Sequence, residues 1–133
     1  MSNRITAFVA FYFKGNEISA SIEMDLNSYM EAGGKLPALY PLLARSINID
    51  LYSYEYEMMQ VEQVRFRDAQ GLVVDHVCDE ILDIISFEQA WKERRVLMQL
   101  QLIARDKMGV DDLEHNPDLK EALLDAWRLG RSD

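Results

Sequence analysis

Residues 5–26 read ITAFVAFYFKGNEISASIEMDL, and this stretch decides the fold. Apolar residues recur at every second position on both sides of Gly15-Asn16, a dipeptide that readily adopts positive φ. We therefore expect strands 5–14 and 17–26 to form a β-hairpin around a two-residue turn. The apolar pairs on one face would be Phe13 with Ile18, Phe11 with Ala20, Val9 with Ile22, Ala7 with Met24 and Ile5 with Leu26. A slip of one residue would mix the two faces, so the pattern also specifies a register.

The more polar face of the same hairpin carries two aromatic residues, Phe8 and Tyr12, beside Ser19, Ser21 and Glu23. Aromatic side chains bordered by polar groups are typical of binding or dimer surfaces. The alternative is that other elements of the same domain cover them. Phe8 and Tyr12 are therefore candidate partner-binding residues, and the sequence allows a homodimer formed by symmetric pairing.

The next segments are predicted as two helices and a strand. One helix, capped by Asn27 or Ser28, should end at Gly33-Gly34, and a second should run from Pro37 to about Ile47. The segment after it fits two patterns. Alternation predicts a strand through Tyr52, Tyr54, Tyr56 and Met58, whereas helical spacing connects Ile47, Leu51, Tyr54, Met58 and Val61. We favour a strand over residues 47–61, because tyrosine and isoleucine prefer pleated surfaces.

A second hairpin is expected from Val61–Arg67 and Leu72–Val77. The residues between them, Asp68-Ala69-Gln70-Gly71, are typical of a type I turn followed by a glycine bulge. The predicted cross-strand pairs are Phe66 with Val74, Val64 with His76, and Arg65 with Asp75 as an ion pair.

From Asp79 the apolar period becomes helical. Ser86 and Gln89 resemble a capping box for a long helix that should run to Met108. Asn116-Pro117-Asp118 should open a final helix that ends before Gly130. These elements predict an α+β fold, with a largely antiparallel sheet of four or five strands packed against the long helix and the C-terminal helix. At 133 residues we expect one domain, 1–133, with residues 110–133 as a C-terminal helical appendage.

Acidic residues are concentrated in the middle of the chain. The formal net charge is -9, and residues 46–90 contain ten acids and only two bases. Such a field repels phosphate backbones, so a nucleic-acid partner is not expected, and it favours basic protein partners or solubility. The sequence has no apolar stretch typical of a signal peptide or membrane span, and Cys78 is its only cysteine. We therefore expect a cytoplasmic protein that does not associate with membranes.

The sequence contains no recognisable catalytic motif. His76 and Cys78 could ligate a metal from one side of a strand, but further ligands lack a motif spacing. The acids around His115 do not match a calcium-binding loop, and Gly33-Gly34-Lys35 lacks the other residues of a phosphate-binding loop. No catalytic residue, metal or cofactor is therefore assigned.

These observations favour a non-enzymatic, acidic protein-interaction module, such as an adaptor, a chaperone-like factor or a neutralising partner of a basic protein. The candidate partner-binding residues are Phe8, Tyr12, Tyr52, Tyr54, Glu55, Tyr56, Glu57 and Glu62. The alternative hypothesis is a small-molecule-binding domain or minor enzyme with a pocket between the sheet and the long helix. That pocket would use Tyr54, Tyr56 and His76.

Overall fold

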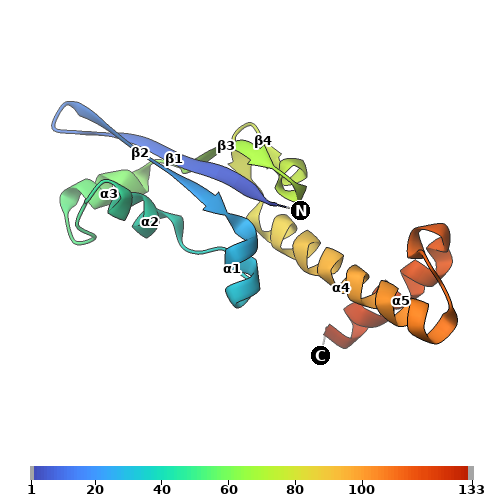
Figure 1. Ribbon diagram of the computed structural model, residues 1–133. Coiled ribbons are helices and arrows are strands. Elements are labelled where there is room, and N and C mark those ends of the chain that lie inside the picture. Colours follow the sequence, from blue (N-terminus) through green and yellow to red (C-terminus); the bar gives the residue numbers. More distant parts are fainter. Residues whose placement is uncertain (1, 132–133) are drawn as a thin grey trace. The chain divides into compact units, whose positions relative to one another are not determined.

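The chain divides into two compact units, which we call the sheet unit (residues 1–88) and the helical unit (residues 89–133). The computed structural model describes residues 2–131 and the side chains of residues 2–130. Five strands and three α-helices of the described chain lie in the sheet unit (Figure 1). The long helix α4 (Ile84–Met108) begins there and continues into the helical unit, where α5 (Pro117–Arg131) follows. The α+β class is confirmed, whereas a single domain with a C-terminal appendage stays a prediction.

The predicted N-terminal hairpin is present as β1 (Arg4–Phe13) and β2 (Asn16–Asp25). Its turn residues are Lys14 and Gly15, both at positive φ, and not Gly15-Asn16. The register therefore differs by two residues from the predicted one, and the observed pairs include Phe11 with Ile18, Val9 with Ala20 and Ile5 with Met24. Because the shift is an even number, the predicted apolar face is kept, and it is buried except at Phe13, Ile18 and Ile22, which are half-buried.

Strand β3 (Arg65–Gln70) adds to the free edge of β1, which gives an antiparallel sheet in the order β2-β1-β3. The predicted second hairpin is wrong. Residues after β3 form a 3-10 helix, η1 (Leu72–His76), and then β4 (Val77–Cys78) pairs with β5 (Ile81–Leu82) in a separate two-stranded sheet. The pairs expected across that hairpin, Phe66 with Val74, Val64 with His76 and Arg65 with Asp75, are therefore absent.

Two contacts explain this difference. The amide of Phe66 donates to the carbonyl of Glu80 at 2.9 Å, and the guanidinium of Arg65 pairs with the Glu80 carboxylate at 3.4 Å. The turn that presents Glu80 uses positive φ at both Asp79 and Glu80. The β4–β5 turn thus takes the place next to β3 that the sequence pattern assigned to residues 72–77.

Three short helices connect the strands: α1 (Leu26–Gly33), α2 (Leu39–Ser46) and α3 (Tyr54–Val61). The first ends at a left-handed Gly34, as predicted, but is preceded by Asp25 and not by Asn27 or Ser28 at its N-cap. The second begins two residues after Pro37. Helices α2 and α3 contact the hairpin and lie along one face of it (Figure 1).

The predicted strand over residues 47–61 is wrong, because its second half is helix α3. Ser53 caps this helix, since its hydroxyl accepts a hydrogen bond from the amide of Tyr56 at 3.2 Å. Glu55 and Glu57 lie in the first turn, where the helix dipole favours negative charge. Met59 is fully buried and anchors the helix in the core.

The long helix begins two residues before Ser86. Asp83 precedes it, and its carboxylate accepts a hydrogen bond from the Ser86 amide at 3.1 Å. The helix ends at Met108, as predicted, before Gly109 at positive φ. A 3-10 turn, η2 (Leu113–His115), leads to α5, which starts at Pro117 as predicted but continues through Gly130. Among the described residues, no helix has the length and apolar character needed to cross a membrane.

Gly71 offers a test of the junction between β3 and η1. It has φ of +92°, and an added Cβ would lie 2.2 Å from the backbone oxygen of Ser2. We expect Gly71→Ala to lower the free energy of unfolding by at least about 3 kcal/mol, because steric overlap adds to the cost of positive φ. Gly15→Ala is the matched control, since Gly15 has φ of +81° with open space around it. It should lose only about 1–2 kcal/mol in urea unfolding. Equal losses would contradict the close approach.

Candidate functional site

Helix α3 presents apolar side chains to solvent. Tyr54, Met58 and Val61 are spaced i, i+4, i+7, so they form one stripe along the helix. They are 77%, 43% and 74% exposed, and Tyr52 in the preceding turn is 98% exposed. We call these four residues the α3 face. Because Met59 points into the core, the short helix is apolar on two sides.

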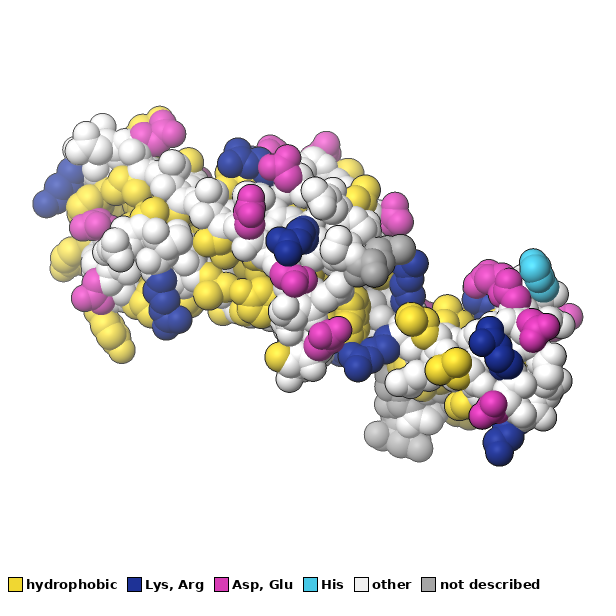
Figure 2. Space-filling view, in the orientation of Figure 1, with side chains coloured by type: hydrophobic (Ala, Val, Ile, Leu, Met, Phe, Trp, Pro, Cys, Tyr) yellow, Lys and Arg dark blue, Asp and Glu magenta, His cyan; other side chains and the backbone are white. Residues whose placement is uncertain are grey.

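The surroundings of the α3 face are acidic. Residues 46–64 contain four acids, Asp50, Glu55, Glu57 and Glu62, and no lysine, arginine or histidine. Figure 2 shows hydrophobic side chains with acidic and basic ones among them at the end of the sheet unit that holds α2 and α3. The face is therefore an exposed apolar stripe in a segment of negative charge, which Arg45 and Arg65 flank.

Local hydrogen bonds fix both ends of α3. Before the helix, the Asp50 carboxylate accepts from the amide of Tyr52 at 2.9 Å, and the Asp50 carbonyl accepts from the Ser53 hydroxyl at 2.6 Å. After the helix, the Tyr40 hydroxyl donates to the carbonyl of Glu62 at 2.6 Å. The α3 face is thus presented by a helix that is held to the preceding turn and to α2.

Six of the eight predicted partner-binding residues lie on α3 or within two residues of it. Among them Tyr52, Tyr54, Glu57 and Glu62 are exposed, while Glu55 and Tyr56 are half-buried. Met58 and Val61 are two further exposed residues of this surface that were not predicted, although both belong to the helical spacing through residues 47–61. The signal for a helix was Ser53 as a cap, followed by two acids in the first turn.

The other two predicted residues, Phe8 and Tyr12, lie on the opposite face of the sheet from α3. Strand residues alternate between faces, and their neighbours Val9 and Phe11 are buried on the helix-covered side. The structure therefore does not bring Phe8 and Tyr12 together with the α3 residues.

Both aromatic residues on that outer face contact neighbours in the sheet. The Arg67 guanidinium lies over the Phe8 ring, 4.8 Å from its centroid. The Tyr12 hydroxyl donates to the Glu17 carboxylate at 3.0 Å, and this hydrogen bond, together with the negative charge of Glu17, raises the pKa of the Tyr12 phenol. Tyr12 therefore remains a protonated donor at neutral pH.

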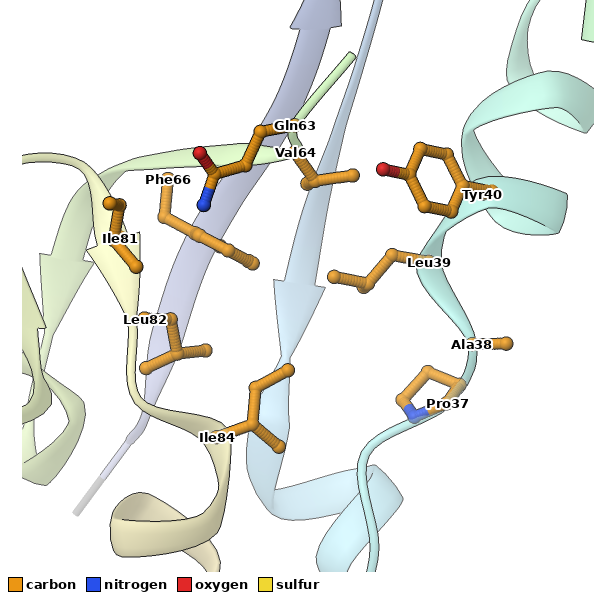
Figure 3. Close-up of a pocket in the computed structure, with 10 residues that line it drawn as sticks. All are labelled: Pro37, Ala38, Leu39, Tyr40, Gln63, Val64, Phe66, Ile81, Leu82 and Ile84. Atoms are coloured by element: carbon orange, nitrogen blue, oxygen red, sulfur yellow. The ribbon is translucent and has the colours of Figure 1, made fainter. Parts of the chain in front are cut away.

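A separate apolar groove of about 340 Å³ lies elsewhere in the sheet unit. Figure 3 shows its lining side chains, which come from the start of α2, from the start of β3 and from the β5–α4 junction. They are Pro37, Ala38, Leu39, Tyr40, Gln63, Val64, Phe66, Ile81, Leu82 and Ile84. The Gln63 amide and the Tyr40 hydroxyl are the polar side-chain groups among them.

The residues expected to line a pocket between the sheet and the long helix, Tyr54, Tyr56 and His76, do not line this groove. Tyr54 and Tyr56 belong to α3. The Nδ1 of His76 lies 2.7 Å from the Ser86 hydroxyl, and its ring meets Phe87 edge-on at 6.0 Å between centroids. His76 therefore supports the start of α4.

The chain shows no assembled metal centre in the part that the structure describes. No group of three or more histidine, cysteine, aspartate or glutamate residues is placed there to hold an ion. Cys78 is a free, exposed thiol. His115 lies 3.7 Å from the Asp112 carboxylate, both at the surface before α5.

The helical unit has a surface hollow of its own. It has a volume of about 600 Å³ and is lined by Arg94, Leu97, Met98, Gln101, Leu102, Leu113 and Glu114. We call it the α4 groove. The hollow depends on the loop between α4 and α5, because two of its lining residues belong to η2.

Gln101 makes three of the side-chain hydrogen bonds that hold that loop against α4, and Arg105 adds one to the carbonyl of Asp111 at 3.4 Å. Its Nε2 donates to the carbonyls of Val110 at 3.1 Å and Asp111 at 2.9 Å. Its Oε1 accepts a hydrogen bond from the Leu113 amide. A salt bridge between Arg128 and Glu93 joins α5 to α4 farther along.

Replacing Gln101 should loosen the helical unit. We expect Gln101→Leu to cost about 2 kcal/mol of stability, because three hydrogen bonds are lost and the part-buried carbonyl of Val110 and amide of Leu113 lose their side-chain partner. The amide of Leu113 should then exchange with solvent deuterium faster than in the wild type. Gln99→Leu is the control, since Gln99 is an exposed neighbour on the same helix. If both variants leave the exchange of Leu113 unchanged, the side chain of Gln101 does not hold the loop.

Comparison with known proteins assigns no family to the chain. It matches no protein-family model, no curated protein and no solved structure.

Proposed function

We propose that this protein is a non-enzymatic interaction module whose α3 face binds a basic, amphipathic segment of another protein. The observation that carries the proposal is the exposed stripe of Tyr54, Met58 and Val61, set in a segment, residues 46–64, with four acids and no base. Apolar surface of this kind, bordered by charge of one sign, suits a partner that is itself apolar on one side and basic around it.

The apolar part of the surface supplies affinity. Burying a methionine or valine side chain contributes about 1.5–3 kcal/mol, and tyrosine is among the residues that most often dominate binding energy. Hydrogen bonds fix both ends of α3, so its backbone is already ordered before a partner binds. Binding therefore costs little backbone conformational entropy. A small face can therefore give a useful affinity.

The negative charge of the sheet unit steers a basic partner toward it. This unit contains fourteen acids and six bases, whereas the helical unit contains nine acids and eight bases. The negative field is thus centred on the unit that carries the α3 face, and it accelerates the approach of a basic partner. Such steering weakens with salt, because the Debye length falls from about 30 Å at 0.01 M to about 8 Å at 0.15 M.

A pair of synthetic peptides tests the proposal. One carries leucine and lysine with helical spacing, and the other has glutamate in place of every lysine. We expect fluorescence titration to show binding of the lysine peptide alone, with affinity falling as salt is added. Tyr54→Ala should weaken binding about tenfold, because it removes an anchor of the apolar stripe.

Two matched controls separate the α3 face from a general effect of charge. Tyr12→Ala removes a tyrosine of similar exposure from the other face of the sheet and should leave affinity unchanged. Glu57→Lys should weaken binding more than Asp75→Lys, although both change the net charge equally and both positions are exposed. If these pairs behave alike, the peptide responds to overall charge and the α3 face is not the site.

A second candidate function is the binding of a small apolar molecule in the groove of the sheet unit. Its volume of about 340 Å³ lies within the range of ligand sites, and its walls are mainly aliphatic. The Tyr40 hydroxyl already donates to the carbonyl of Glu62, so the Gln63 amide is the group that would orient a ligand.

Indole serves as a neutral probe of this groove. We expect titration to shift the backbone amide resonances of Leu39, Val64 and Leu82, and Ile81→Asp to abolish these shifts by placing a charge at the exposed edge. Ile85→Asp is the control, because Ile85 is also exposed but does not line the groove. Shifts that persist in Ile81→Asp, or that never appear, would exclude this function for the groove.

A further inference from the structure

The helical unit leaves several large apolar side chains exposed to solvent. Among its described side chains, Ala104, Leu113 and Leu124 are the buried apolar residues. The large exposed ones are Met98, Leu102, Ile103, Met108 and Leu129. Helical units of this size seldom have an adequate core without assembly, so part of this surface needs a cover.

From this surface we infer that two copies of the chain pair through the α4 groove, in antiparallel orientation. Arg94, Leu97, Met98, Gln101 and Leu102 follow one another along one face of α4. Arg94 lies seven residues before Gln101, which corresponds to about 10 Å at 1.5 Å per residue. Gln101 holds the loop that leads to η2, so the η2 end of the groove lies away from Arg94.

The two ends of the groove carry opposite charges. Arg94 is exposed and has no ion-pair partner among the described side chains. At the other end Glu114, whose side chain is 68% exposed, contacts Lys120 at 2.8 Å through one carboxylate oxygen. A twofold axis near Met98 places Arg94 of each copy next to Glu114 of the other. The groove is therefore complementary to itself in charge as well as in its apolar centre.

The balance of charge also favours a second copy over a strongly charged partner. The helical unit carries nine acids and eight bases, so two such units meet without net repulsion. The sheet unit, with fourteen acids and six bases, lacks this property. Two paired helical units contribute four helices, a number from which a bundle with a shared apolar core can be built.

Sedimentation equilibrium of the full chain over micromolar concentrations tests this inference. We expect a monomer–dimer equilibrium in the wild type. Met98→Glu should raise the dimer dissociation constant on the order of a hundredfold, or about tenfold for each copy, because it places a carboxylate in the apolar centre twice. Met108→Glu is the matched control: the two methionines are 68% and 61% exposed, but Met108 does not line the groove. It should leave the constant unchanged.

Charge exchange tests the orientation of the two copies. Arg94→Glu and Glu114→Arg should each weaken the dimer. The double variant should recover part of the lost affinity, because the exchanged charges again face one another, although Glu114 no longer pairs with Lys120. A chain that stays monomeric, equal effects of Met98→Glu and Met108→Glu, or no recovery in the double variant would each overturn the inference. Binding of the lysine peptide at the α3 face should be unaffected in Met98→Glu, so the two proposals fail or hold separately.

Discussion

The apolar face of the β1–β2 hairpin is the constraint on which the rest of the sheet unit depends. A two-stranded ribbon is not stable alone in water, so Ile5, Val9, Phe11 and their neighbours need a cover. Strand β3 extends the sheet, and α2 and α3 lie along the hairpin. Met59 commits one side of α3 to this task. Because α3 has only eight residues, that commitment also determines which of its side chains face solvent, namely those of the α3 face.

The hairpin was predictable because its two faces differ along the whole length of both strands. Alternation with a period of two assigns each residue to a face of the hairpin but does not determine which residue it pairs with. The buried face was therefore correctly identified, while the predicted pairs were displaced by two residues. The turn explains the displacement. Lys14 adopts φ of 53°, a conformation that a lysine in the sequence does not reveal. The helix 117–131 was predictable for a similar reason, since its apolar residues repeat along one face. The helix 84–108 was predictable from its length and from the capping pattern of Ser86 and Gln89, because its apolar residues are not confined to one face.

The elements that the sequence analysis assigned wrongly depend on contacts between distant residues. Strand β3 pairs with β1, some sixty residues earlier in the chain, and Gly71 packs against Ser2 and Asn3. No local pattern indicates either contact, and the residues 61–77 were read instead as a hairpin of neighbours. Helix α3 failed differently. Its apolar residues lie on two sides, so the helical spacing that runs to Val61 left Met59 off its stripe, and alternating tyrosines then favoured a strand. The surface property that made it hard to predict also makes it the candidate site.

The two proposed surfaces follow from one asymmetry of charge. Apolar side chains are exposed in both units, but in the sheet unit they lie in an acidic field, which repels a second copy and attracts a basic segment. In the helical unit the numbers of acids and bases are nearly equal, so like surfaces can meet. The two contacts would then be linked through avidity, since a dimer presents two α3 faces. A partner with two basic segments gains from an effective concentration that a monomer lacks, even where a single α3 face binds weakly.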